Sequence, residues 1–290
     1  MNAKKHFYDY LELTKDTMKP KTFDTHDRFT RHILNALDSI GITELEQINL
    51  EAGYKILTYY KNHTTNGNNS INKNLRYLKV VMKHYEVFTS IHRLPSLKQD
   101  SEPFRRFSHD ELKQIIKYCK KLDLSKNSLV YRTFIYLALD SGMRKQELLN
   151  VQIRNIDFDK KVIYLEDTKN GFPRLAPFSS FSESCIKELI KVKTRRKYLF
   201  YNRLKKRQLS SNDIRLFYRR MRMDLGLDRI HTHRFRKTFA SILADNGMPL
   251  QYIQKLLDHK SVKTTMVYIQ YDSLKPLEEY KKYNKWHVRK

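Results

Sequence analysis

The apolar residues of this chain follow a helical spacing except in one stretch, and that stretch limits the folds available to it. Helical spacing of three and four residues runs through most of the sequence. Between 153 and 178, apolar and polar residues alternate instead, which is typical of half-buried strands. Three antiparallel strands are predicted, at 153–158, 162–167 and 173–178, with Asn170-Gly171 as the turn between the last two. We therefore expect a mainly α-helical chain with one small antiparallel β-sheet.

A break in both periodicities divides the chain. Helical patterns at about 23–37, 45–60 and 71–88 place residues 1–93 in a helical domain, with a polar loop expected in the asparagine-rich stretch 62–74. The stretch 94–106 carries two prolines and follows neither period, so it is predicted to be a linker. Residues 107–290 form the second domain, and 290 residues suffice for two separate cores.

The charge of the chain predicts a polyanionic partner, most simply nucleic acid. Its 57 Lys and Arg outnumber its 31 Asp and Glu, a formal net charge of +26. Thirteen Lys and Arg lie between 191 and 222 with Asp213 as the single opposing charge, and helix 71–88 has a basic side. Such surfaces can follow a duplex backbone, although any one cation can equally be a solvated surface charge. The candidate DNA contacts are Lys73, Arg76, Lys79, Arg195, Arg196 and Arg219.

Several other classes of protein are disfavoured. No apolar run reaches the length of a membrane-spanning helix, and the first ten residues lack the apolar core of a signal peptide. The positive charge is spread over the chain, unlike that of a membrane-surface helix. Cys119 and Cys185 are too few for a disulfide framework, and no nucleotide-binding or zinc motif occurs. We expect a cytoplasmic, nucleoid-associated protein that uses neither a cofactor nor a metal.

The stretch 230–271 holds the side chains best suited to take part in a chemical reaction. It predicts a helix at 232–244 that ends at Asn246-Gly247, a second at 250–257, and a third beginning near Ser261. His233, Arg236 and Lys237 share one face of the first helix, while a neighbouring apolar stripe faces the core.

His259 and Tyr268 follow at a spacing of nine residues. Arginine offers paired donors to a phosphate, histidine can move a proton, and tyrosine offers a phenol nucleophile. Two simpler interpretations stay open. With nineteen tyrosines in the chain any single tyrosine can be a core residue, and the segment could be a helix-turn-helix that only binds DNA.

Two further candidates precede this stretch. A helix is expected at 109–119 behind a Ser108/Glu111 capping box, then an apolar helix at 130–140, then another after Ser141-Gly142. Arg144 and Glu147 lie three residues apart at the start of the latter, where free amides also favour an anion, although such a pair is commonly a surface ion pair. Lys169 lies on the predicted hairpin turn, where a solvated lysine is the simpler interpretation.

Four segments combine into one pattern: His233-x-x-Arg236, LLDH ending in His259, TTMVY ending in Tyr268, and SGMRKQELL around Arg144. This pattern resembles the signature of the tyrosine recombinases, the phage integrase and Xer-type family. The resemblance covers about 107–271. It implies an α+β catalytic domain joined to a helical core-binding domain as a two-domain DNA clamp. Two residues depart from the family pattern: Lys237 stands where many members have histidine, and Asp258 replaces the usual glycine.

The resemblance also implies roles. Tyr268 attacks the scissile DNA phosphate to give a 3′-phosphotyrosine, and Lys169 protonates the leaving 5′-oxygen. Arg144, Arg236 and His259 neutralise the phosphate, His233 acts as the base, and Glu147 supports the site. Strand exchange then passes through a Holliday junction.

The implied partners are double-stranded DNA with specific sites and accessory DNA-bending proteins. The chain would be a monomer or weak dimer when free and a homo-tetramer on two DNA sites, with the tail 272–290 inserting into a neighbouring subunit. Two alternatives stay open: a topoisomerase of type IB, which needs no four-subunit assembly, and a DNA-binding protein without activity.

Overall fold

The computed structural model describes residues 1–98, 105–122, 126–166, 173–191, 196–202 and 204–258. These residues form two compact units, Met1–Pro103 and Phe104–Lys290, whose division lies inside the stretch 94–106 expected to be a linker. Each unit has its own cluster of buried apolar side chains. No described helix is long and apolar enough to cross a membrane.

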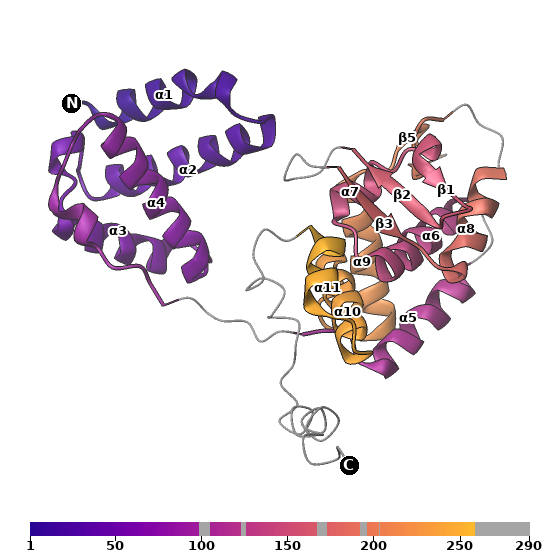
Figure 1. The fold of residues 1–290 in the computed structure, drawn as a ribbon. Helices are drawn as coiled ribbons and strands as arrows, with labels where there is room; N and C mark the ends of the chain where they lie inside the picture. Colours follow the sequence, from indigo (N-terminus) through magenta and orange to yellow (C-terminus); the bar gives the residue numbers. More distant parts are fainter. Residues whose placement is uncertain (99–104, 123–125, 167–172, 192–195, 203, 259–290) are drawn as a thin grey trace, which may run out of the picture. The chain divides into compact units, whose positions relative to one another are not determined.

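The described residues of the first unit form a bundle of four α-helices, with short 3-10 turns before α2, before α3 and after α4 (Figure 1). Its helices are α1 (Ala3–Leu13), α2 (Pro20–Ser39), α3 (Leu50–His63) and α4 (Asn68–His84). Helix α2 packs against the other three, and the fully buried Phe7, Ile33 and Leu78 lie in their common core. The single helix expected at 45–60 is divided into a 3-10 turn at Leu45–Gln47 and α3, because the Asn49 side chain caps α3 by accepting from Ala52 N.

The asparagine-rich loop predicted at 62–74 is wrong in its second half, because α4 already begins at Asn68. Asn72 is buried, and its amide group donates to the Leu97 carbonyl and accepts from the Leu97 N–H, both at 2.9 Å. A turn-forming residue thus serves inside a helix by pairing with the backbone of a distant segment. Leu94 and Leu97 pack on the same core, so the first part of the expected linker belongs to this unit.

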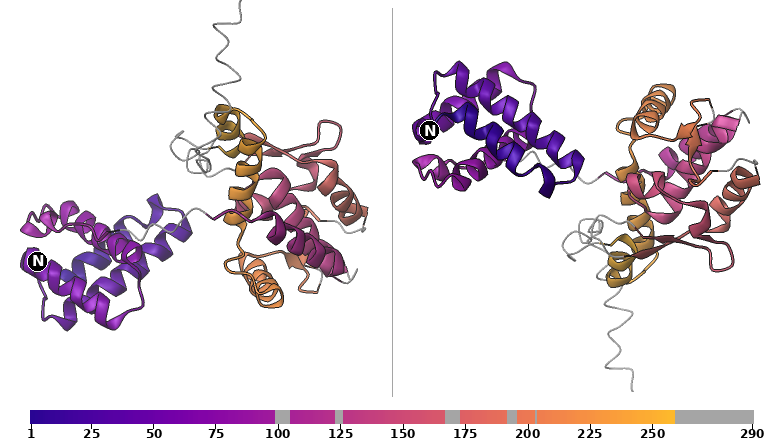
Figure 2. Two further views of the ribbon diagram at one scale, coloured as in Figure 1. Left: turned by 90° about the horizontal axis from the view of Figure 1, so that it is seen from below. Right: turned by 90° about the horizontal axis from the view of Figure 1, so that it is seen from above.

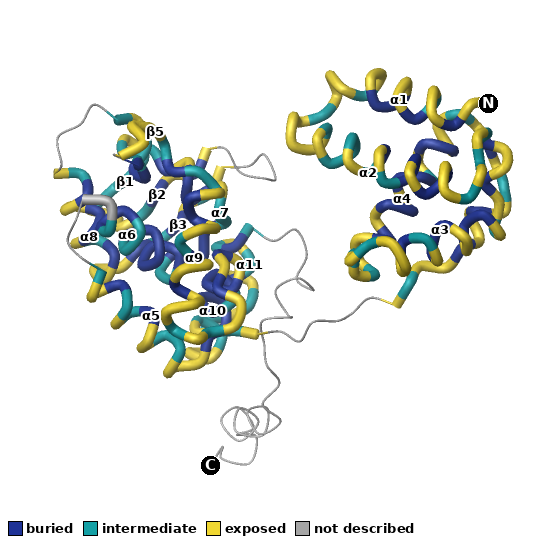
Figure 3. Tube along the Cα trace, turned by 180° about the vertical axis from the view of Figure 1, so that it is seen from behind, coloured by how far each residue is buried: buried dark blue, intermediate teal, exposed yellow. Residues whose placement is uncertain are grey.

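The second unit is built around α6 (Lys126–Ser141), which packs against α5 (His109–Lys121), α8 (Ser180–Lys191) and α10 (Thr232–Asp245). Figure 3 shows the buried course of α6 beside the partly exposed α5. The predicted Ser108/Glu111 capping box is confirmed at the start of α5. The other α-helices among the described residues of this unit are α7 (Lys145–Leu149), α9 (Ser211–Leu225) and α11 (Leu250–Leu257).

The predicted three-stranded antiparallel sheet is present, in the order β1 (Ile156–Asp157), β2 (Val162–Leu165) and β3 (Arg174–Pro177). Its first strand is shorter than expected. Residues Ile153–Asn155 form a 3-10 turn, and the Ile153 N–H donates to the Lys197 carbonyl instead of to a neighbouring strand. A second hairpin, β4 (Tyr201–Asn202) and β5 (Arg207–Gln208), lies in the basic tract and was not expected. The Asn170-Gly171 turn lies outside the described residues.

Helices α10 and α11 lie together along one side of the unit (Figure 2). They share a small apolar cluster of their own, which includes Phe239, Ile253 and Leu257. Phe239 also comes very close to Gly142, where a Cβ atom would lie 2.4 Å from a ring carbon and φ is +59°. Glycine is therefore required at this turn, which brings α10 next to the start of α7.

Candidate active site

Arg144 is held at the N-terminus of α7 by Glu147. The Arg144 N–H donates to Oε2 of Glu147 at 2.7 Å, and its Nη1 donates to Oε1 at 2.8 Å. The Glu147 side chain is 4% exposed, whereas that of Arg144 is 25% exposed. The structure thus brings together the two residues predicted to act as a pair, with the carboxylate fixed below the guanidinium.

A second arginine, Arg174 on β3, completes the surroundings of Glu147. Its Nη2 donates to Oε2 of Glu147 at 2.6 Å, and its Nη1 donates to the Leu256 carbonyl at 2.5 Å. Burial alone would raise the pKa of Glu147, but Arg174 and Arg144 more than offset this, so its pKa is lowered and it stays ionised. Arg174 was not predicted as a site residue, although it lies two positions before the buried Ala176 and so on the same, inner face of the strand.

Arg236 reaches the same place from α10. It is 2% exposed, its Nη1 donates to the Gly142 carbonyl at 2.9 Å, and its Nη2 donates to the Leu257 carbonyl. Arg234, two positions earlier, points elsewhere: its guanidinium binds both carboxylate oxygens of Glu111 at 2.7 Å. One helix therefore uses one arginine to secure the start of α5 and the other to build the site.

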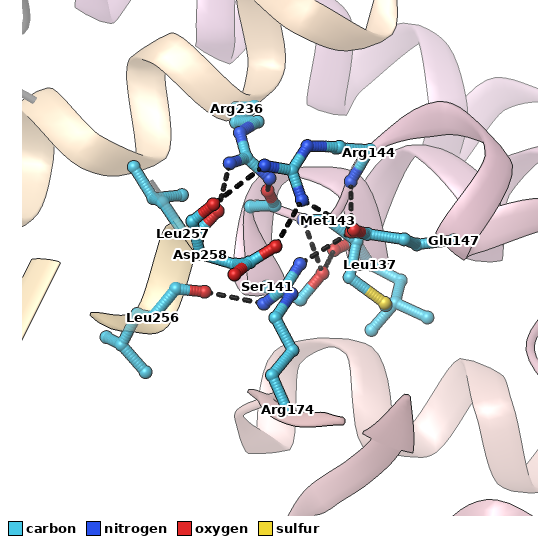
Figure 4. A network of polar contacts seen from close by, with 11 residues as sticks. Leu137, Ser141, Met143, Arg144, Glu147, Arg174, Arg236, Leu256, Leu257 and Asp258 are labelled. Carbon is cyan, nitrogen blue, oxygen red and sulfur yellow. Dashed lines mark hydrogen bonds and ion pairs between the residues drawn. The ribbon is translucent and has the colours of Figure 1, made fainter. Parts of the chain in front are cut away.

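Asp258 ends α11 in the left-handed conformation, with φ 52° and ψ 52°. Its carboxylate accepts from Arg144 Nη1 at 3.1 Å, and its carbonyl accepts from Arg144 Nη2 at 2.9 Å (Figure 4). Glycine adopts this conformation without cost, and aspartate is one of the few other residues that tolerate it. The left-handed backbone conformation thus explains why glycine is usual at this position in the family. The aspartate of this chain adds a carboxylate beside Arg144.

Arg144, His233 and Arg236 line a single cleft of about 770 Å³. Across it, α9 contributes Arg215, Arg219 and Arg222, spaced so that they share one helix face. Among the described residues that line this cleft there is no Asp or Glu. An arrangement of this kind attracts an anion and can bind its oxygens with several directed donors.

His233 is neutral in this cleft. The pKa of His233 is lowered to about 4, chiefly by desolvation of the imidazole. The nearby Lys237, Arg236, His231 and Arg144 contribute to this lowering. His233 is nevertheless an exposed residue that lines the cleft. A neutral, accessible imidazole can accept a proton from a nearby hydroxyl group.

Tyr218 lines the cleft too, but it is unsuited to attack. It is buried, its hydroxyl lies 2.9 Å from Thr232 Oγ1, and burial raises the pKa of its phenol further above the usual value. The predicted residues Lys169, Arg195, His259 and Tyr268 lie outside the described residues.

The remaining predicted DNA contacts fall into two groups. Lys73 and Arg76 are exposed on α4, and Arg219 is exposed at the cleft. Lys79 is half-buried and donates to the Leu94 carbonyl at 2.9 Å, and Arg196 donates to the Leu189 carbonyl in the last turn of α8. The last two therefore make structural contacts within the protein. Among the described residues, no group of three or more His, Cys, Asp or Glu could hold a metal ion.

Comparisons with known proteins point to one family. The model of the phage integrase family matches residues 105–274. A probable integrase/recombinase of Acholeplasma phage L2 is 50% identical over 286 residues, covering 99% of either protein. A tyrosine recombinase XerA of Saccharolobus solfataricus is 27% identical over 195 residues, 67% of this chain and 62% of that protein.

Among solved structures, the Tn1549 transposon integrase in complex with a circular intermediate DNA has a TM-score of 0.80 at 17% identity, with 96% of this chain and 99% of that chain covered. A lambda integrase dimer bound to a core site has a TM-score of 0.76 at 17% identity, with coverages of 92% and 77%. These likenesses confirm the predicted fold class.

Proposed function

Because this chain belongs to the phage integrase family and is a tyrosine-type site-specific recombinase, we propose that it cuts and rejoins double-stranded DNA through a 3′-phosphotyrosine on Tyr268 and a Holliday junction. One observation carries the proposal: Arg144, predicted from one motif, and His233 and Arg236, predicted from another, line one cationic cleft. Two arginines and a neutral imidazole suit a phosphodiester that gains charge on its non-bridging oxygens as it is attacked.

The proposed reaction needs no external energy. The Tyr268 oxygen forms a bond to phosphorus while the bond to the 5′-oxygen breaks, so one phosphoester replaces another. His233 takes the phenol proton, and Lys169 gives a proton to the leaving oxygen. Arg144, Arg236 and His259 stabilise the pentavalent transition state, each contributing about 3 kcal/mol if it resembles an oxyanion-hole donor. A second 5′-hydroxyl then reverses the attack on the new partner strand.

We further propose that the chain integrates and excises a mobile DNA element and does not resolve chromosome dimers. The motivation is that the phage protein named a probable integrase/recombinase matches nearly the whole chain at 50% identity, whereas the XerA protein matches about two thirds of it at 27%. This is tested by measuring recombination between two plasmids that carry candidate attachment sites. Recombination only between two identical chromosomal sites would contradict it.

The proposed assembly is a tetramer on two DNA sites, held by the tail 272–290. Related integrases have been solved in complex with DNA, one of them as a dimer on a core site. In the tail, apolar residues recur about every three positions, which would give a short helix one apolar stripe. A chain that ends at Ser273 should bind one site normally and lose cooperative binding to two sites in a gel shift. Unchanged cooperativity would place the tail on its own subunit.

The central test concerns the nucleophile. Tyr268→Phe should bind DNA like the parent and form no covalent adduct on a nicked suicide duplex, because only the phenol oxygen is lost. Tyr271→Phe, three residues away, is the matched control and should form the adduct. An adduct with Tyr268→Phe that disappears with Tyr271→Phe would refute the assignment.

A further inference from the structure

Three arginines bind three successive carbonyl groups at the end of α11. Arg174 donates to Leu256 at 2.5 Å, Arg236 donates to Leu257, and Arg144 donates to Asp258 at 2.9 Å (Figure 4). The last carbonyls of a helix have no partner within the helix and carry the negative end of its dipole. The arginines come from β3, α10 and the start of α7, so one helix end joins three elements of the site.

Arg174 differs from the other two. Arg144 and Arg236 line the cleft, whereas Arg174 does not, and its side chain is only 7% exposed. Its second donor binds Oε2 of Glu147, whose Oε1 accepts from Arg144. A continuous path of short polar contacts therefore runs from the end of α11 through Arg174 and Glu147 to Arg144.

On the basis of the function proposed above, we infer that Arg174 is a positioning residue for the transesterification, which acts on the phosphate only through Arg144. Arg174 holds the Glu147 carboxylate in place and also binds the end of α11, so that the Arg144 guanidinium keeps one orientation toward the cleft. Without Arg174, the buried Glu147 carboxylate would have Arg144 as its main cationic partner and would draw Arg144 inward. The guanidinium would then be displaced from the phosphate position.

The geometry explains why this position holds arginine. Nη1 and Nη2 of one planar group reach acceptors on two different elements from two separate nitrogens, whereas a lysine would have to serve both acceptors from a single nitrogen. Burial of the charge is tolerated because Arg174 and Arg144 are balanced by Glu147 and Asp258.

The test compares Arg174→Gln and Arg174→Lys with the parent at saturating DNA, with covalent adduct formation as the readout. Misplacing a group by about 1 Å can cost about 100-fold in rate, which we expect for Arg174→Gln, with a smaller loss for Arg174→Lys. DNA affinity in a gel shift should be unchanged. Arg154→Gln is the matched control, because Arg154 is a 71% exposed arginine of the same unit that lies 3.9 Å from the Glu166 carboxylate. It should cleave like the parent.

Two readouts separate positioning from a merely structural role. A methylphosphonate at the scissile position removes one charged oxygen and with it much of the need for Arg144, so the deficit of Arg174→Gln should shrink on this substrate. The double variant Arg144→Ala/Arg174→Gln should be no slower than Arg144→Ala. Equal deficits on both substrates, or multiplied deficits in the double variant, would overturn the inference. If Arg174→Gln does not fold, the same comparisons on Arg174→Lys decide. Failure of the proposed function itself would appear earlier, as a parent protein that forms no adduct.

Discussion

At the scale of single residues, His233 shows how an active site can prepare a base by desolvating it and placing cations near it. Burial and four nearby cationic or titratable side chains lower the pKa of His233 to about 4, below the ordinary value of 6.5. The imidazole is therefore neutral at pH 7 and can accept a proton. A phosphodiester bound between Arg144 and Arg236 would offset part of their charge and strengthen the base when substrate is present.

This leads to a titration experiment. In the free protein, the NMR signal of His233 should stay that of a neutral ring until the pH falls to about 4, and a short DNA duplex should raise this midpoint. Because the folded pKa lies below the unfolded value, the unfolded chain binds the proton first, and stability is lost as the pH falls from about 6.5 toward 4. His233→Gln assigns the signal and should lack this loss. A midpoint near 6.5 without DNA would contradict the argument.

Residue types and spacing predicted the pair Arg144 and Glu147 and the shared face of His233 and Arg236, because these depend on local helix geometry. They did not predict Arg174, whose partners lie 27 and 82 positions away in the chain. Nor did they predict the burial of Asn72, since a turn-forming residue pairs with a backbone segment 25 positions distant. Contacts that depend on tertiary packing leave no periodic pattern in the sequence.

At the scale of elements, α9 divides the basic tract into structural and cleft-facing cations. Asp213 caps α9 by accepting from the Ser210 N–H at 2.9 Å, and it binds Lys205 and Arg207 at 2.9 and 2.8 Å. Burial alone would raise the pKa of Asp213, but Arg207, Ser210 and Lys205 lower it well below its usual range. The charge count of the tract therefore overstated its DNA-facing surface. Within the observed α9, Arg215, Arg219 and Arg222 share one face, which lines the cleft.

Neighbouring arginines on α9 give a matched test. Arg219 lines the cleft, whereas Arg220 is 80% exposed and lies 3.7 Å from Asp224 one turn further on. Arg219→Ala should reduce the slope of log affinity against log salt by about 1, as expected when one phosphate contact is lost. Arg220→Ala should leave the slope unchanged. Fluorescence anisotropy of a labelled duplex between low and physiological salt measures both, and equal slopes for the two variants would remove the case for a directed face.

At the scale of the whole molecule, the two units differ sharply in charge. Residues 1–103 contain 15 Lys and Arg against 12 Asp and Glu, a net charge of +3. Residues 104–290 contain 42 against 19, a net charge of +23, which together with the first unit gives the +26 of the chain. The attraction to a polyanion therefore belongs almost entirely to the unit with the cationic cleft. The first unit has its own apolar core and a basic side on α4, which suits it to add contacts once the second unit is bound.

The last prediction follows from this asymmetry. Residues 104–290 have a separate core, so we expect them to fold alone and to keep most of the salt dependence of DNA binding, because that dependence counts neutralised phosphates. Affinity for a specific site at fixed salt should nevertheless fall by about 100-fold, because the first unit no longer binds at the high effective concentration that the linker provides. Anisotropy titrations of the full chain and of 104–290 on the same duplex, across a salt series, test both statements. If the slope instead fell by half, the first unit would neutralise as many phosphates as the second, and its charge would be a poor guide to its contacts.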